Sequence, residues 1–145
     1  MADLLSLARA PEPDRATAEA AMRFLRDEGP LQLACMARDL FPILRRCAKP
    51  EDDVDVLLAR LEYDDLDLAD ARNRALKILW AMSVGRRVSA ERRVQLSVYA
   101  VMESNRLALE AAIVLPLAQV RLTKIDREQL LWSISERRGW RRGID

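Results

Sequence analysis

The chain has 145 residues, half of them hydrophobic, and its 24 Lys and Arg nearly balance its 23 Asp and Glu. A chain of this length buries roughly two thirds of its unfolded surface around one core, and its apolar content is too high for intrinsic disorder. Only four glycines and few aromatic residues stand against abundant Ala, Leu, Arg and Glu, a balance that favours helix over strand. We therefore expect an all-α fold: a single compact helical bundle of about six or seven helices over residues 1–145.

Targeting, membrane and metal-binding patterns are missing from the sequence. The first residues lack a basic region, and no stretch approaches about 18 uninterrupted apolar residues, so we expect a cytoplasmic protein without membrane contact. Cys35 and Cys47 lie roughly 18 Å apart on one predicted helix, too far for a disulfide. The chain has no histidine, which disfavours a thiol–imidazole metal site. We expect two small buried cysteines, no metal and no cofactor.

The first third of the chain predicts short helices separated by prolines. A helix over residues 3–10 ends at a Pro-Glu-Pro turn, and Asp14 begins the next helix as its N-cap. Gly29-Pro30 predicts a left-handed C-cap and a stop. A helix over residues 31–48 contains Pro42, which removes a hydrogen bond and predicts a kink or two short helices.

Two helices are expected in the middle of the chain, one from Val54 to Leu61 and one from Leu66 to Val84. Acidic residues open the first helix, where the helix dipole favours them, and others fall at the connection between the two. The second helix is apolar around more than half of its circumference, which is typical of a central helix. Gly85 should close it.

The longest periodic element runs from Ser89, its expected N-cap, to Leu115. We expect its inward seam to consist of Val94, Val98, Val101, Ala108, Ala112 and Leu115, widened by Leu96, Tyr99, Met102, Leu109 and Ile113. Asn105 falls on this seam, where it either fixes the register between packed helices or lies at the seam's edge. Pro116 then predicts a kinked continuation or the start of a loop.

The last predicted helix spans residues 124–138. Thr123 and Asp126 resemble a capping box at its start, and Gly139 should end it. Residues 137–145 form a basic tail, which is either mobile or folded back onto the bundle.

Charge is distributed unevenly along the chain. Residues 1–72 contain ten Lys or Arg and sixteen Asp or Glu, whereas residues 73–145 contain fourteen and seven. The first half is therefore acidic and the second half basic.

Arginine pairs and one tryptophan mark the candidate basic site, because guanidinium groups suit phosphate oxygens and aromatic rings stack on bases or fill a partner's pocket. The alternative is a solvated surface, since adjacent helical residues point about 100° apart. The basic candidates are Arg86, Arg87, Arg92, Arg93, Arg137, Arg138, Trp140, Arg141 and Arg142.

The acidic stretch is a candidate docking surface for a basic partner, including the basic half of another copy. A divalent cation is the weaker interpretation, because the EF-hand glycine and terminal glutamate are missing. The acidic candidates are Glu51, Asp52, Asp53, Asp55, Asp64, Asp65, Asp67 and Asp70.

An enzymatic function is disfavoured. Without histidine, neither a Ser-His-Asp nor a Cys-His arrangement is possible, and the chain contains no GxxxxGK[ST], GxGxxG or HExxH motif. We expect no catalytic residue and no small-molecule substrate.

The sequence thus favours a non-enzymatic subunit or adaptor that binds protein partners or itself through its acidic and basic halves. A head-to-tail array of this kind should dissociate as ionic strength rises.

The alternative is sequence-independent binding to the RNA or DNA backbone by the basic half. In size and helical class the chain is similar to the small helical subunits that line CRISPR effector complexes, although no residue motif carries this likeness. A secretion or phage-assembly chaperone, or an immunity protein, is a further alternative.

Overall fold

The computed structural model describes residues 2–140, which form five continuous helices rather than the expected six or seven. The elements are α1 (Ala2–Arg9), α2 (Arg15–Ala34), η1 (Cys35–Leu40), α3 (Phe41–Cys47), η2 (Pro50–Asp52), α4 (Val54–Ser83), α5 (Ala90–Leu109), η3 (Glu110–Val114), α6 (Leu115–Arg121) and α7 (Lys124–Arg137). Segments η1 and η3 are π-helical, and η2 is a short 3₁₀ turn. The all-α bundle is confirmed.

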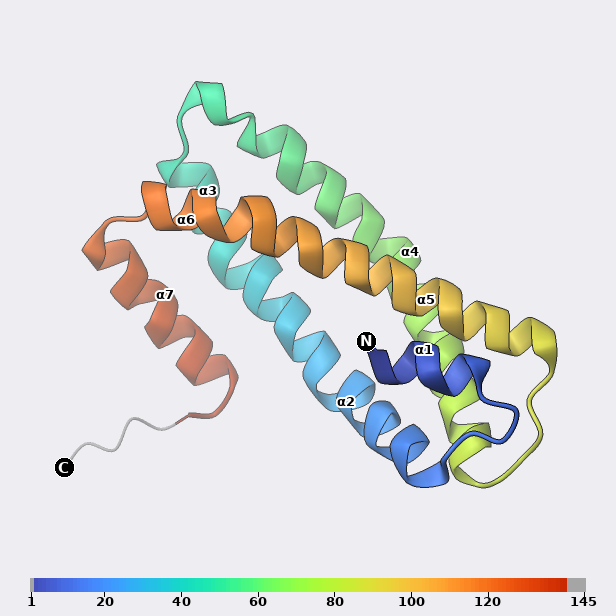
Figure 1. Ribbon diagram of the computed structural model, residues 1–145. Helices are drawn as coiled ribbons and strands as arrows, with labels where there is room; N and C mark the ends of the chain where they lie inside the picture. The colour runs from blue at the N-terminus through green and yellow to red at the C-terminus, as the bar shows by residue number, and fades with distance from the viewer. Residues whose placement is uncertain (1, 141–145) are drawn as a thin grey trace.

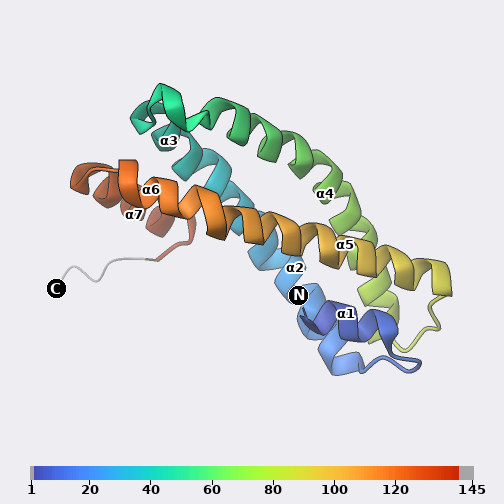
Figure 2. The same ribbon diagram turned by 45° about the horizontal axis from the view of Figure 1, so that its top comes forward.

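Three long helices form the body of the bundle. The continuous helix α2–η1–α3 packs on α4, and α4 packs on the continuous helix α5–η3–α6, which crosses the front of the molecule in Figure 1. Helix α1 packs on α5 at one end, as Figure 2 also shows, and α7 lies against η1 at the other. Within residues 2–140, no helix is long and apolar enough to cross a membrane.

Pro30, Pro42 and Pro116 all lie within continuous helices. The stop predicted at Pro30 is therefore wrong, and at Pro42 and Pro116 the chain continues rather than breaks. Pro30 lies inside α2, and Gly29 is a buried helical residue rather than a left-handed cap, because α2 remains packed on α4 beyond it. Pro42 and Pro116 each follow directly on a π-helical segment, within the first two residues of α3 and α6. A widened turn accommodates the proline ring and its missing N–H, so the chain continues as one helix.

The acidic stretch does not form a connection between two helices. Helix α4 runs for 30 residues from Val54 to Ser83, and it carries Asp64, Asp65, Asp67 and Asp70 within its length. The predicted break near these residues was wrong, because α4 is held on both sides, by α2 and by α5.

Helix ends that depend on local side chains match the sequence. Asp14, Ser89 and Thr123 each accept a hydrogen bond from the backbone N–H three residues later, as N-caps do. Gly85 and Gly139 adopt positive φ just beyond α4 and α7. At Gly85 the Arg15 guanidinium also packs where a Cβ would stand, so this position requires glycine for two reasons.

The hydrophobic core has two parts at opposite ends of the long helices. The first part joins α1, α2, the second half of α4 and the start of α5 around the buried Leu79, Leu96 and Tyr99. The second joins α3, the first half of α4, η3 and α6 around Phe41, Leu44 and Leu58. Cys35 is buried and Cys47 is half-buried, both as free thiols.

Helix α5 faces the core with a different side from the one predicted. Leu96 and Tyr99 are buried, but they are followed on the inward face by Glu103, Arg106 and Glu110 rather than by apolar residues. The predicted seam lies outside instead, with Val94, Val98, Val101, Ala108, Ala112 and Leu115 all exposed. Asn105 is exposed with them.

Helix α7 is held mainly by polar contacts, because Asp126 is its one buried residue. Arg46 donates to Asp126 at 2.6 Å, and Arg137 donates twice to the buried Asp39, at 2.7 and 2.8 Å. Of its apolar side chains, Leu130 packs against the second part of the core, and Leu131 and Trp132 are exposed. This helix should therefore depend on its ion pairs more than the others do.

We expect Leu58→Ala to destabilise the protein by about 2–5 kcal/mol, because Leu58 is fully buried in the second part of the core. Urea unfolding measures the change. Val56→Ala is the matched control, because Val56 lies on the opposite, solvent-facing side of α4 and is 73% exposed. This substitution should lower the free energy of unfolding by less than about 0.5 kcal/mol. Equal losses in both variants would contradict this core.

Candidate interaction surfaces

Charged side chains lie between the two parts of the core. Asp65 and Arg72 come from α4, Glu103 and Arg106 from α5, and Glu110 from η3. Arg72, Glu103, Arg106 and Glu110 are buried, and Asp65 is partly buried. We call these five residues the charged layer. It contains three carboxylates and two guanidinium groups, so each buried charge has a neighbour of opposite sign.

Arg106 is the centre of the charged layer. Its Nε donates to Asp65 Oδ1 at 2.6 Å, and its Nη2 donates to Asp65 Oδ2 at 3.3 Å. Its Nη1 lies 2.5 Å from Glu110 Oε1 as an ion pair, without the angle of a hydrogen bond. With 5% of its side chain exposed, Arg106 links α5 to α4 and to the next turn of its own helix.

Arg72 fills the space beside α2. A Cβ on Gly29 would lie 3.5 Å from Arg72 Nε, an ordinary van der Waals distance, so the guanidinium lies close to α2 at this position. The Nε and Nη2 atoms of Arg72, the Tyr99 hydroxyl and Glu103 Oε2 are buried without a hydrogen-bond partner. With three carboxylates and two guanidinium groups, the fully ionised layer has one negative charge in excess, and its hydrogen-bonding groups are only partly satisfied.

Burial raises the pKa values of Glu103 and Glu110, and the nearby Arg106 opposes this rise in both. Burial likewise raises the pKa of Tyr99, with a further contribution from Glu103. The folded protein thus binds protons at these glutamates more readily than the unfolded chain does.

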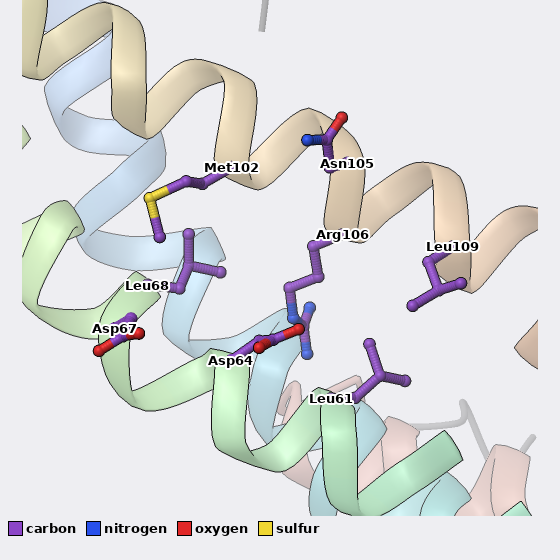
Figure 3. A pocket seen from close by; sticks show the side chains of 8 residues that line it. All are labelled: Leu61, Asp64, Asp67, Leu68, Met102, Asn105, Arg106 and Leu109. Carbon is purple, nitrogen blue, oxygen red and sulfur yellow. The ribbon is translucent and has the colours of Figure 1, made fainter. Parts of the chain in front are cut away.

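A pocket of about 240 Å³ opens beside the charged layer, between α4 and α5. Figure 3 shows Arg106 pointing from α5 towards α4 and Asn105 pointing away from it. The pocket is lined by Leu61, Asp64, Asp67, Leu68, Met102, Asn105, Arg106 and Leu109. The single guanidinium of the pocket is already hydrogen-bonded to Asp65 and paired with Glu110, so Arg106 has few N–H donors left for a ligand.

The acidic candidates are divided among several environments. Asp52 accepts two hydrogen bonds from Arg121, both at 2.7 Å, which hold the pKa of its carboxyl at about 2. Asp65 belongs to the charged layer. Asp53 precedes α4 in a left-handed conformation. The remaining acidic candidates are Glu51, Asp55, Asp64, Asp67 and Asp70, of which Asp64 is half-buried and the others are exposed.

Four of the basic candidates gather at the connection between α4 and α5. A hollow of about 660 Å³ is lined there by Arg15, Arg86, Arg87 and Arg93, together with the Pro11–Pro13 turn. Arg93 donates to the carbonyl oxygens of Ala10 and Pro11, which fixes that turn. Arg86 stacks over Trp80 at 4.9 Å, and Arg92 lines a neighbouring hollow beside it.

Arg137, Arg138 and Trp140 lie at the end of α7 or just beyond it, at the opposite end of the molecule from this connection (Figure 1). Arg137 is bound to Asp39, and Arg138 donates to Glu28 at 3.0 Å and stacks over the exposed Trp140 at 5.1 Å. Arg141 and Arg142 lie outside the described residues. The structure therefore does not bring the arginine pairs into one groove.

A further surface feature is one that the sequence interpretation placed in the core. Over residues 94–120, all of them described, the only charged residues are Glu103, Arg106 and Glu110, and all three are buried. The outer side of this stretch exposes Val94, Val98, Val101, Asn105, Ala108, Ala111, Ala112, Ile113, Leu115, Pro116, Gln119 and Val120. We call it the uncharged face.

Among residues 2–140, no three Cys, Asp or Glu side chains gather closely enough to hold a metal ion. Comparison of the chain with protein-family models, with curated proteins and with solved structures finds no match. The geometry of the surfaces described above is therefore the basis for any functional proposal.

We expect Arg106→Met to destabilise the protein by about 3–5 kcal/mol at pH 7.5, because it leaves buried carboxylates without their partner. The loss should be smaller at pH 5, since the pKa values of Glu103 and Glu110 are raised and protonation removes the uncompensated charge. Urea unfolding at both pH values tests this. The control is Arg60→Met, whose side chain is 73% exposed, and a loss independent of pH would contradict the prediction.

We expect Asp126→Asn to loosen α7 selectively. Hydrogen bonds from Thr123 and Arg46 hold the pKa of the Asp126 carboxyl at about 2, below its value in the unfolded chain. Its stabilising effect is therefore present above about pH 4 and is lost as the pH falls towards 2. Amide protection factors, which correct for the intrinsic pH dependence of hydrogen exchange, should fall in α7 and not in α4, in the variant at pH 7 and in the natural chain below pH 4. Glu128→Gln, on the same helix, should leave the exchange of α7 unchanged.

Proposed function

We propose that the protein is a non-enzymatic helical subunit that works through protein–protein contacts, and that its contact surface is the uncharged face of α5, η3 and α6. The observation that carries the proposal is a stretch of 27 residues without an exposed charge, in a chain of which 32% is charged. Charge depletion is the compositional mark of the centre of an interface. A contiguous apolar patch of this extent is typical of surfaces that bind another protein.

The distribution of ion pairs supports this surface over the acidic and basic halves. Asp39 pairs with Arg137, Asp52 with Arg121, and Asp65 with Arg106, each joining the acidic half to the basic half within one chain. Glu28–Arg138 and Arg46–Asp126 also join the two halves. The side chains in these ion pairs are already paired within one chain, so they are not available for the contacts between chains that a head-to-tail array would need.

A photo-crosslinking residue placed at position 101 tests the proposal in cells that make the protein. We expect a covalent adduct with another protein chain, because Val101 lies in the middle of the uncharged face. The same residue at position 56, on the exposed side of α4, is the control and should give much less adduct. Val98→Glu should abolish the adduct at position 101. Equal labelling at positions 101 and 56 would contradict the proposal.

A second candidate function is binding of the RNA or DNA backbone, favoured by the hollow at the connection between α4 and α5. Arg15, at the start of α2, and Arg86 and Arg87, in the connection between α4 and α5, line it from two segments of the chain, with Glu12 as the acidic residue beside them. Guanidinium groups around one hollow suit phosphate oxygens.

If these three arginines each neutralise one phosphate, the affinity for single-stranded RNA should fall with a log–log slope of roughly −2 against salt. Fluorescence anisotropy with a labelled oligonucleotide measures it. Arg87→Glu should weaken binding strongly, whereas Arg127→Glu, outside this hollow, should have little effect. Undetectable binding at low salt would remove this candidate.

A further inference from the structure

We propose that the uncharged face binds a second copy of this chain and forms a symmetric dimer centred on Asn105. The inference rests on the proposed function, since it names the partner of the same surface. Its basis is the spacing of the exposed residues, the position of Asn105, the charge of the face and its area.

The spacing of the exposed residues is that of paired helices. Seven exposed positions follow one another at alternating intervals of four and three: Val94, Val98, Val101, Asn105, Ala108, Ala112 and Leu115. This interval places the residues on one stripe that a second helix can follow over its whole length. The stripe stays exposed through η3, so the π-helical turn does not move it into the core.

Small side chains border the stripe and let a second helix come close. Ser97 and Ser104 are half-buried beside it, and Ala108, Ala111 and Ala112 are exposed along it. The Ser104 hydroxyl donates to the Ala100 carbonyl at 2.7 Å, so a partner can cover it without leaving a donor unpaired.

Asn105 selects an identical partner. It is the middle one of the seven positions, and its amide points outward from α5 (Figure 3). An amide offers both donors and an acceptor, so two Asn105 side chains satisfy each other across a twofold axis. An apolar side chain opposite Asn105 would leave a buried amide unpaired, which would weaken the affinity by roughly 5- to 150-fold.

The lack of exposed charge on the face also favours a second copy of the chain as its partner. Glu103, Arg106 and Glu110 point into the charged layer, so the outer side offers no charge to attract a charged surface. A charged partner would lose solvation and gain no ion pair. The same face of a second copy matches in length and in its lack of charge.

The area is sufficient for a reversible dimer. Residues 94–120 extend over roughly 40 Å at 1.5 Å per residue, and a helix is about 11 Å wide, which gives roughly 440 Å² in projection on each copy. Two copies thus bury roughly 880 Å² in projection, which is below the about 1,000–1,200 Å² of stable specific interfaces and within the range of weak, transient ones. We therefore expect a dimer that dissociates in the micromolar range.

Sedimentation equilibrium of the full chain from 1 to 100 µM tests the dimer. We expect a monomer–dimer equilibrium whose dissociation constant changes less than about threefold between 0.1 and 0.5 M NaCl, because no exposed charge lies in the face. Val98→Glu should weaken the dimer at least tenfold. Val56→Glu introduces the same charge on α4 and should leave it unchanged. Circular dichroism confirms that each variant remains helical.

Asn105→Asp and Asn105→Lys test the symmetry. Each variant alone should be a monomer at concentrations where the natural chain is a dimer, because like charges would meet at the axis. An equimolar mixture should restore a dimer that contains one chain of each kind. If the natural chain dimerises but the mixture does not, Asn105 does not meet its copy and the proposed symmetry is wrong.

The crosslinking experiment separates the two proposals. An adduct at position 101 with twice the mass of the chain supports both. An adduct of another mass, with the purified chain a monomer at 100 µM, overturns the dimer and leaves the proposed function standing. A monomeric chain without an adduct overturns both.

Discussion

The pairing of Arg106 with Asp65 and Glu110 is the constraint on which the rest of the bundle depends. A guanidinium that is almost fully buried needs carboxylates at fixed positions on two different turns and two helices. Sliding or rotating α5 by one residue would separate these charges in a low-dielectric interior, at a cost of several kcal/mol. The charged layer therefore fixes the register of α5 against α4, which two apolar cores on their own would specify less sharply. Arg72 extends the charged layer towards α2, because its guanidinium lies beside Gly29.

The charged layer also explains why the outer side of α5 is apolar. A helix of this length with three inward charges has few inward positions left for large apolar residues between Ala100 and Val114. Val94, Val98 and Val101 lie on the opposite side, outside both parts of the core. A single exposed valine is common on protein surfaces. Here the exposed valines are aligned over several helical turns, and no exposed charged residue lies between them. The same helix thus has one face whose electrostatics fix its orientation and one face that is free to bind.

The sequence predicted the fold class and the helix ends that depend on neighbouring residues, as Asp14, Ser89 and Thr123 show. It predicted a stop at Pro30, where the helix continues, and it left open whether the chain kinks or breaks at Pro42 and Pro116, because the packing on either side of each proline is set by residues distant in sequence. The inward side of α5 was missed because the valine stripe is more hydrophobic than the true inner side. One signal was present: Glu103, Arg106 and Glu110 share one face of a stretch that is otherwise uncharged from Val94 to Val120. Three charges that align in this way on an apolar helix indicate an internal ion-pair network as readily as a solvated face.

Charge pairing within the chain and the lack of charge on its outer face have a common consequence for association. The ion pairs between the acidic and basic halves hold the chain together, as the bonds of Arg121 to Asp52 and of Arg137 to Asp39 show. They do not attract a second molecule, so long-range steering contributes little and an encounter depends on the short-range fit of the uncharged face. Valine and alanine bury less apolar area than leucine or aromatic residues, which limits the affinity of that face. An interface of this composition assembles and dissociates with concentration, and its specificity lies in the amide of Asn105 rather than in charge.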